Sequence, residues 1–286
     1  MSEPVRILCP AKVNLLLRVL SREETGYHGI ETVLCLIDLA DELIAERREE
    51  PGIALETEAT GLGPAEENLA VRAADMVLEA TGRKFGVRLG LKKRIPVQAG
   101  LGGGSSDAAA ALEAVNRLAG NVVPHHELLQ FGARLGSDIP FFVAGGSLAL
   151  AWGHGERMFR LPSLPKAPAL LVVPPVRVPT ADAYHWVDQA RATGTSRGAV
   201  ALDHDSLSSW GSIGRMAGNE FESVVFSHHP PVREAFEALV ATHPLVCRMT
   251  GSGSTLFAVY RSERDRDDAK MMLPARLGER IAIETA

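Results

Sequence analysis

The stretch PVQAGLGGGSSDAAAAL, residues 96–112, places four glycines directly before two serines and a run of alanines. Alanine is the strongest helix former, so a helix is predicted to begin near Ser105. Its free N–H groups and positive dipole end would face the loop, where glycines let a ligand approach the backbone. We therefore predict that the loop binds a polyphosphate. The residues assigned to it are Pro96, Val97, Gln98, Ala99, Gly100, Leu101, Gly102, Gly103, Gly104, Ser105 and Ser106.

A plain turn and three better-known loop motifs fit this stretch less well. Glycines before a helix can form a simple turn, but here four glycines, two serines and a helix start coincide. No Gly-Lys-Ser or Gly-Lys-Thr follows, so the loop is not a Walker A motif, and the G-x-G-x-x-G spacing of a Rossmann fingerprint is missing. A His-Arg-Asp loop and an Asp-Phe-Gly triplet are also missing, which argues against a protein kinase.

Hydrophobic periodicity predicts an α+β chain around the loop. Apolar side chains at residues 68–81 form one helical stripe, and residues 53–59 alternate as in an edge strand. A proline-rich stretch at residues 162–168 indicates a boundary between domains at 1–163 and 164–286. Further expectations are a strand pair or a strand with a following turn at 5–20, two successive strands over 30–44 that meet near Leu39, a loop and then a β region over 136–158, loop with short helices over 189–218, and a strand over 247–260.

Composition limits the classes of function. The 286-residue chain is 46% hydrophobic and has a formal net charge of -5, which fits a globular protein and argues against binding nucleic acid. Cys9, Cys35 and Cys247 are scattered, so neither a disulfide framework nor a zinc site is expected. The sequence contains neither a signal peptide nor an apolar run that would span a membrane. We expect a cytoplasmic protein that acts on small molecules.

Three blocks of the chain resemble the GHMP kinases. They are the glycine-rich loop, PAKVNLLL at residues 10–17 and MTGSGSTLFAVY at residues 249–260. The resemblance covers almost the whole chain. It implies an N-terminal domain like ribosomal protein S5, a C-terminal ferredoxin-like domain and an active site in the cleft between them. It also implies that ATP, with Mg²⁺, phosphorylates a small-molecule alcohol.

The same resemblance assigns the groups needed for phosphoryl transfer. Asp138 resembles the family's base, which accepts the proton of the attacking hydroxyl, and Lys12 resembles the lysine that stabilises charge on the transferring phosphoryl group. Asn68 resembles a residue on the adenosine side, and Lys93, which precedes the loop, is a candidate for contact with the nucleotide. Simpler alternatives remain: Asp138 as a turn residue before a proline, and both lysines as solvated strand residues.

One subgroup of the family is indicated by the triplet Gly26-Tyr27-His28. Its members phosphorylate the 2-hydroxyl of a cytidine-diphosphate-linked methylerythritol, in the non-mevalonate route to isopentenyl diphosphate. The resemblance implies that Tyr27 and His28 recognise cytosine, and that Tyr184 supplies an aromatic ring on the opposite face of the base. Other residues assigned to the substrate are Asn14, Thr180, Gly251, Ser252 and Gly253.

Two other functions remain open on the sequence alone. Another GHMP kinase, acting on homoserine or a mevalonate derivative, would keep the loop, Lys12 and Asp138 but would not need the cytosine site. A nucleotide sensor without catalysis would have no use for a base. The metal ligand stays unknown, with Ser105, Ser106 and Asp107 as candidates. We expect a monomer or a weak homodimer.

Overall fold

The computed structural model describes residues 3–24, 26–192 and 202–286. In this part of the chain a 7-stranded sheet has the order β3-β4-β2-β1-β8, and β5 and β6 extend it from β2. The strand pairs β1–β2, β2–β4, β2–β5 and β5–β6 are antiparallel, whereas β3–β4 and β1–β8 are parallel. The strands are β1 (Val5–Arg22), β2 (His28–Arg48), β3 (Ile53–Glu56), β4 (Gly86–Lys92), β5 (Leu148–Gly153), β6 (Arg157–Arg160) and β8 (Gly218–Asn219).

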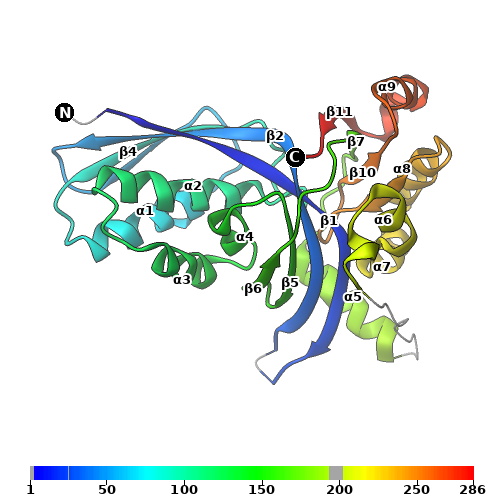
Figure 1. Ribbon diagram of the computed structural model, residues 1–286, viewed down its shortest axis with the longest axis horizontal. Helices are drawn as coiled ribbons and strands as arrows, with labels where there is room; N and C mark the ends of the chain where they lie inside the picture. Colours follow the sequence, from blue (N-terminus) through cyan, green and yellow to red (C-terminus); the bar gives the residue numbers. More distant parts are fainter. Residues whose placement is uncertain (1–2, 25, 193–201) are drawn as a thin grey trace.

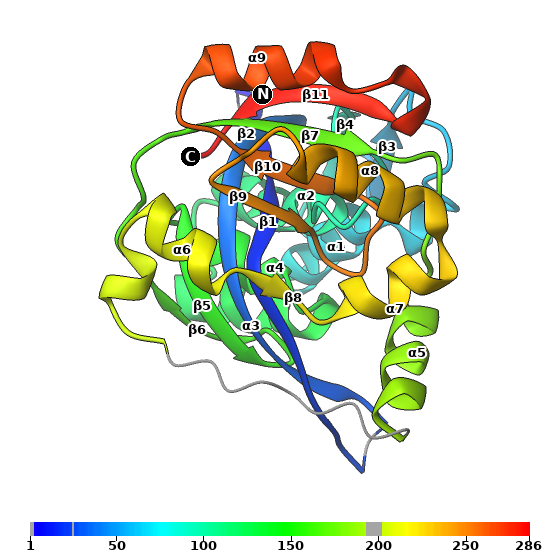
Figure 2. The same cartoon turned by 90° about the vertical axis from the view of Figure 1, so that its right-hand side faces the viewer.

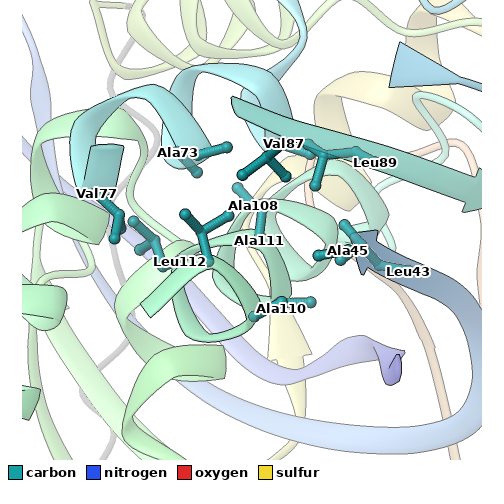
Figure 3. Close-up of a cluster of buried hydrophobic side chains, with 14 of the residues drawn as sticks. Leu43, Ala45, Ala73, Val77, Val87, Leu89, Ala108, Ala110, Ala111 and Leu112 are labelled. Carbon is teal, nitrogen blue, oxygen red and sulfur yellow. The ribbon is translucent and has the colours of Figure 1, made fainter. Parts of the chain in front are cut away.

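Four helices lie beside this sheet on one side (Figure 1). They are α1 (Leu69–Ala80), α2 (Gly103–Leu118), α3 (His125–Leu135) and α4 (Ile139–Ala144). Ala108 and Ala111 of α2 belong to a buried cluster that also contains Leu43 of β2 and Leu89 of β4 (Figure 3). Because alanine is small, α2 can pack closely on the strands, and its first turn is thereby fixed at the end of the glycine-rich loop.

A second, 4-stranded sheet has the antiparallel order β11-β7-β10-β9 (Figure 2). Its strands are β7 (Pro168–Val173), β9 (Val246–Met249), β10 (Leu256–Val259) and β11 (Glu279–Glu284). The helices of this half are α5 (Thr180–Ala192), α6 (Trp210–Met216), α7 (Phe221–His228), α8 (Pro230–Val240) and α9 (Glu263–Met272). Short 3₁₀ helices are η1 (Ala65–Glu67), η2 (Asp205–Leu207) and η3 (Ala275–Leu277).

The long hairpin of β1 and β2 links the two halves. Leu16 and Leu17 of β1 pair with Gly218 and Asn219 of β8, so the first sheet takes a strand from the C-terminal part of the chain. One buried cluster joins Val13 of β1 to residues of the second sheet. The boundary between residues 163 and 164 stays a prediction. No described helix is both long and apolar enough to cross a membrane.

The structure corrects several predicted elements. Residues 30–44, predicted as two strands that meet near Leu39, lie in one continuous strand, which has a β-bulge where Pro10 pairs with Ala40 and Ala11 with Ile37. Residues 139–144 form α4 rather than a loop, with Pro140 in the first turn, where a proline is tolerated. The predicted strand 247–260 is a pair of strands around a glycine turn. In the polar stretch 189–218 the described residues form the end of α5, then η2 and α6, and residues 193–201 lie outside the description.

Candidate active site

Two cavities meet at the glycine-rich loop. The larger, of about 670 Å³, is lined by β1, β2, the loop, residues 137–138, α5 and the turn after β9. The smaller, of about 330 Å³, follows the loop itself. Gly100, Gly102 and Ser105 line both cavities. The loop therefore forms the border between the two cavities.

The smaller cavity contains most residues that were predicted to bind ATP. It is lined by Asn68, Lys93 and every residue from Pro96 to Ser105. The remaining one, Ser106, is buried and is not part of the lining. Gly102 is the N-cap of α2, has a φ of +72° and supplies no side-chain cap, so the first N–H groups of the helix are available to an anion.

Contacts with two other segments fix the path of the loop. Lys12 N on β1 donates to Leu101 O at 2.9 Å. A Cβ atom added to Gly100, whose φ is +78°, would lie 2.4 Å from Thr250 O. Gly100 is therefore required both by its backbone conformation and by the close approach of the turn after β9.

Lys12 and Asp138 come together in the larger cavity. Lys12 Nζ lies 3.4 Å from Asp138 Oδ2, and the two side chains are 4% and 30% exposed. Lys12 Nζ also donates to Asn14 Oδ1 at 2.8 Å and to Gly100 O at 3.1 Å. The alternative of a solvated Lys12 is therefore wrong. The ammonium group lies beside the loop, and the carboxylate of Asp138 opens into the cavity.

Asn14, which was predicted to contact the substrate, also lines this cavity, but its side chain is buried and engaged with protein groups. Its Oδ1 accepts from Thr250 Oγ1 at 3.1 Å and from Gly251 N at 2.8 Å, as well as from Lys12. Its Nδ2 donates to Thr32 Oγ1 at 2.9 Å. Asn14 thus joins Lys12 to the turn after β9, and its contact with a substrate stays a prediction.

Lys93 is held by two buried carboxylates. Its side chain is 8% exposed and forms ion pairs with Asp41 and, at 2.7 Å, with Asp107. The alternative of a solvated strand end is therefore wrong. Burial, with the charge of Asp41, raises the pKa of Asp107 to about 7, although Lys93 opposes the shift. Lys93 engages Asp107 Oδ2, whereas Asp107 Oδ1 is buried without a hydrogen-bond partner among the described residues, and the role of Asp107 as a metal ligand stays a prediction.

Aromatic side chains gather at the far end of the larger cavity. The rings of His28 and Tyr184 are stacked, with centroids 4.9 Å apart and an interplanar angle of 20°. Tyr27 is exposed, and its ring centroid lies 5.5 Å from that of His154. Burial, followed by the charge of Asp138, raises the pKa of the Tyr184 hydroxyl to about 12. The sequence predicted that these aromatics share a site, but not that His28 stacks on Tyr184.

The turn after β9 completes the cavity wall. Gly251 and Ser252 line it, and Ser252 Oγ lies 3.0 Å from Thr180 Oγ1 at the start of α5. Gly253 is not part of the lining, contrary to its assignment. An added Cβ there would lie 2.7 Å from Met249 Sδ, so Gly253 shapes the turn from inside.

Several residues of the larger cavity were missed by sequence reasoning. They are Arg22, Ser137, His154, His185 and Asp188. Asp188 follows Tyr184 by four residues on α5, and Thr180 precedes Tyr184 by four, so all three lie on one face of the helix. This spacing was the only signal that could have found Asp188 before the structure was known.

Comparisons with known proteins agree with this architecture. The profile of the GHMP kinases N terminal domain matches residues 68–146, and that of the GHMP kinases C terminal matches residues 199–278. The 4-diphosphocytidyl-2-C-methyl-D-erythritol kinase of Solibacter usitatus is 40% identical over 257 residues, 88% of this chain and 79% of its own. That of Geobacter sulfurreducens is 37% identical over 278 residues, 96% of this chain and 97% of its own.

Solved structures give the same result. A crystal structure of 4-(cytidine 5'-diphospho)-2C-methyl-D-erythritol kinase matches with a TM-score of 0.82 and 34% identity, covering 99% of both chains. A homoserine kinase from Cytophaga hutchinsonii shares the fold alone, with a TM-score of 0.73 and 19% identity over 100% of this chain and 95% of its own. This chain therefore belongs to the GHMP kinases, and within them to the 4-diphosphocytidyl-2-C-methyl-D-erythritol kinases.

Proposed function

We propose that this protein transfers the γ-phosphoryl group of ATP to the 2-hydroxyl of 4-diphosphocytidyl-2-C-methyl-D-erythritol, in the non-mevalonate route to isopentenyl diphosphate. The observation that carries this proposal is the position of Lys12 and Asp138 beside the loop where the two cavities meet. The acceptor is the compound from which the relatives that are 40% and 37% identical to this chain take their name.

Asp138 is the base in this proposal. Its partly exposed carboxylate opens into the larger cavity, where an acceptor alcohol would donate its proton. Lys12 is confined by Asn14 and Gly100 to a fixed position next to that carboxylate. A buried ammonium group in a fixed position stabilises the negative charge that develops on the transferring phosphoryl group, since it does not need to reorganise.

The loop and α2 hold the phosphates of ATP. Main-chain N–H groups at the start of α2 and the positive end of the helix dipole face the smaller cavity. Phosphoryl transfer is accelerated mainly by positioning and by neutralisation of charge, so a rigid main-chain cradle fits the reaction. The contacts of Gly100 with the turn after β9 restrict the cradle to one shape.

Mg²⁺ fits this site as an ion that is carried by the nucleotide. No group of three or more His, Cys, Asp or Glu side chains among the described residues would hold a metal. Mg²⁺ is commonly bound by substrate phosphates and water with only one or two protein oxygens. The hydroxyl of Ser105, which lines both cavities, would supply such an oxygen. When bound, the ion neutralises charge on the phosphates.

The test is to measure ADP release by the purified protein with Mg-ATP and one of three acceptors: 4-diphosphocytidyl-2-C-methyl-D-erythritol, homoserine or mevalonate. Turnover with the cytidine compound alone is expected. Turnover with homoserine or mevalonate instead would retain the phosphate site and contradict the cytosine site. Nucleotide binding without turnover of any acceptor would indicate a sensor.

A further inference from the structure

We propose that Asp188 is a positioning residue that makes the acceptor site select cytosine rather than uracil, by fixing the protonation of His28. This inference rests on the proposed function, because it concerns the base of that acceptor. Asp188 Oδ1 lies 2.7 Å from His28 Nε2, at the aromatic end of the larger cavity.

Burial and two contacts immobilise the His28 ring. Its side chain is 6% exposed, one face is stacked on Tyr184, and one edge is hydrogen-bonded to Asp188. Asp188 and Tyr184 are four residues apart on α5, so a single turn of helix supplies both contacts. The other carboxylate oxygen, Asp188 Oδ2, faces Arg22 Nη1 at 4.0 Å. The imidazole is thereby held in one orientation at the cavity wall.

The contact with Asp188 determines what the other nitrogen of the ring can do. An ionised carboxylate accepts hydrogen bonds and donates none, so His28 Nε2 must carry the proton in this contact. In the neutral ring Nδ1 then carries a lone pair and is an acceptor. Among the hydrogen bonds of the described residues, none engages Nδ1. Nδ1 is also not among the buried polar atoms that lack a partner in the described part of the chain, so this acceptor is accessible, and His28 lines the larger cavity.

An acceptor at this place distinguishes the two pyrimidines. The exocyclic group of cytosine is an amino group, a donor, whereas uracil has a carbonyl oxygen at the same position, an acceptor. With Nδ1 as acceptor, cytosine gains a hydrogen bond and uracil brings two acceptors together. A partly buried site that leaves polar groups unpaired rejects the wrong ligand strongly. Stacking on the aromatic rings discriminates poorly, since every base has a π face.

Asp188→Asn tests this role because the amide can either donate to Nε2 or accept from it. The variant therefore no longer requires the proton of His28 to be on Nε2, and Nδ1 can be a donor as well as an acceptor. We would measure kcat/KM for 4-diphosphocytidyl-2-C-methyl-D-erythritol and for its uridine counterpart. The ratio of the two values is expected to fall at least about tenfold in the variant. The change should lie in the KM for the cytidine compound, with kcat changed less than about threefold. Asp182→Asn, an exposed change of the same kind on the same helix, should leave the ratio unaltered.

The outcomes separate this inference from the proposed function. Turnover of the cytidine compound with an unchanged ratio in Asp188→Asn would overturn the role of Asp188 alone. Absence of turnover by the unaltered protein would overturn the proposed function and this inference together. If Asp188→Asn does not fold, ¹⁵N NMR of the unaltered protein at neutral pH replaces it. A neutral His28 protonated at Nε2 is expected, and an Nδ1-protonated or doubly protonated ring would contradict the proposal.

Discussion

Lys12 and Lys93 are both buried lysines next to the phosphate loop, yet their surroundings differ. Lys93 is enclosed by Asp41 and Asp107, both of which are buried. Within the described part of the chain Lys12 has one carboxylate partner, Asp138, at 3.4 Å, and that carboxylate is partly exposed to the larger cavity. Neutral oxygens of Asn14 and Gly100 supply its other contacts.

The difference indicates two roles for the same kind of ion pair. A cation whose carboxylates are all buried contributes to stability, because removal of one partner leaves an unpaired buried charge. A cation held by neutral oxygens near an open carboxylate keeps its position while its partner reacts. We therefore expect that changes around Lys93 alter the free energy of unfolding, and that changes around Lys12 alter the rate of phosphoryl transfer.

Lys93→Met is expected to have the largest effect on stability. It leaves Asp41 and Asp107 buried without a cation, which lowers the free energy of unfolding by about 3–5 kcal/mol. Urea denaturation measures this change. The control is Lys92→Met, at the preceding residue, which is the last of β4. The Lys92 side chain is 67% exposed, and its Nζ lies 3.8 Å from Glu42 Oε2. That variant should differ from the unaltered protein by less than about 0.5 kcal/mol. Equal losses in the two variants would contradict the structural role of Lys93.

Lys12→Met should act on catalysis instead. Loss of a fixed cation at the developing charge lowers kcat by about 100- to 1000-fold. Stability should change by no more than about 1–2 kcal/mol, because Asn14 Oδ1 keeps its donors Thr250 and Gly251. Steady-state ADP release and urea denaturation of the same preparation measure both quantities. A Lys12→Met variant that is strongly destabilised but fully active would contradict the assignment of Lys12 to catalysis.

Gly100→Ala and Gly104→Ala separate two requirements of the loop. An alanine at Gly100 has an unfavourable positive φ and a Cβ 2.4 Å from Thr250 O, so we expect a loss of about 2–3 kcal/mol in stability. At Gly104 the nearest atom outside the helix, Leu69 Cδ1, is 3.9 Å away, and alanine favours the helix by up to about 1 kcal/mol. Thermal denaturation compares the two. A lower affinity for ATP in a stabilised Gly104→Ala would indicate that the phosphates approach this backbone.

Glu222 extends the comparison to a partly buried carboxylate that forms no ion pair with a lysine among the described residues. Burial raises its pKa from 4.5 to about 7, opposed by the hydrogen bond from Met249 N and by the charge of Arg248. Between these two values the folded protein holds a proton that the unfolded chain releases. The bound proton on Glu222 therefore stabilises the folded protein fully at low pH, and this contribution to the free energy of unfolding is lost as the pH rises toward 7.

The variant Glu222→Gln lacks this titration. Its stability relative to the unaltered protein should increase by about 1–3 kcal/mol between pH 4.5 and pH 8. Urea denaturation across this range measures the difference. Glu234→Gln provides a matched control, because Glu234 is exposed and pairs with Arg276 at the surface. Parallel pH curves for Glu222→Gln and the unaltered protein would show that Glu222 is not responsible.

Features that are contiguous in the sequence were the most predictable. The glycine-rich loop before α2, α1 and the edge strand β3 follow from glycine spacing and periodicity, since each depends on neighbouring residues. Residues 30–44 were misread as two strands because their apolar pattern is mixed, and the structure has a β-bulge near Leu39 rather than a strand end. Short apolar segments such as α4 carry too few residues to show a helical period.

The larger cavity was less predictable for the same reason. Lys12 and Asp138 were proposed from the family resemblance, because neither residue's neighbours reveal that tertiary structure brings them to 3.4 Å. Asp188 shows the limit most clearly. Its contact with His28 joins α5 to the start of β2, and no sequence pattern indicates a partner so far along the chain.

A rapid-quench, single-turnover measurement of phosphoryl transfer in Asp138→Asn tests the central claim most directly, since it separates the chemical step from binding. Lys12 retains Asn14 and Gly100 as acceptors in this variant, so the fold should be unchanged. We predict that the transfer rate falls by about 100- to 10,000-fold while both substrates bind with unchanged affinity. A transfer rate equal to that of the unaltered protein would contradict the assignment of Asp138 as the base.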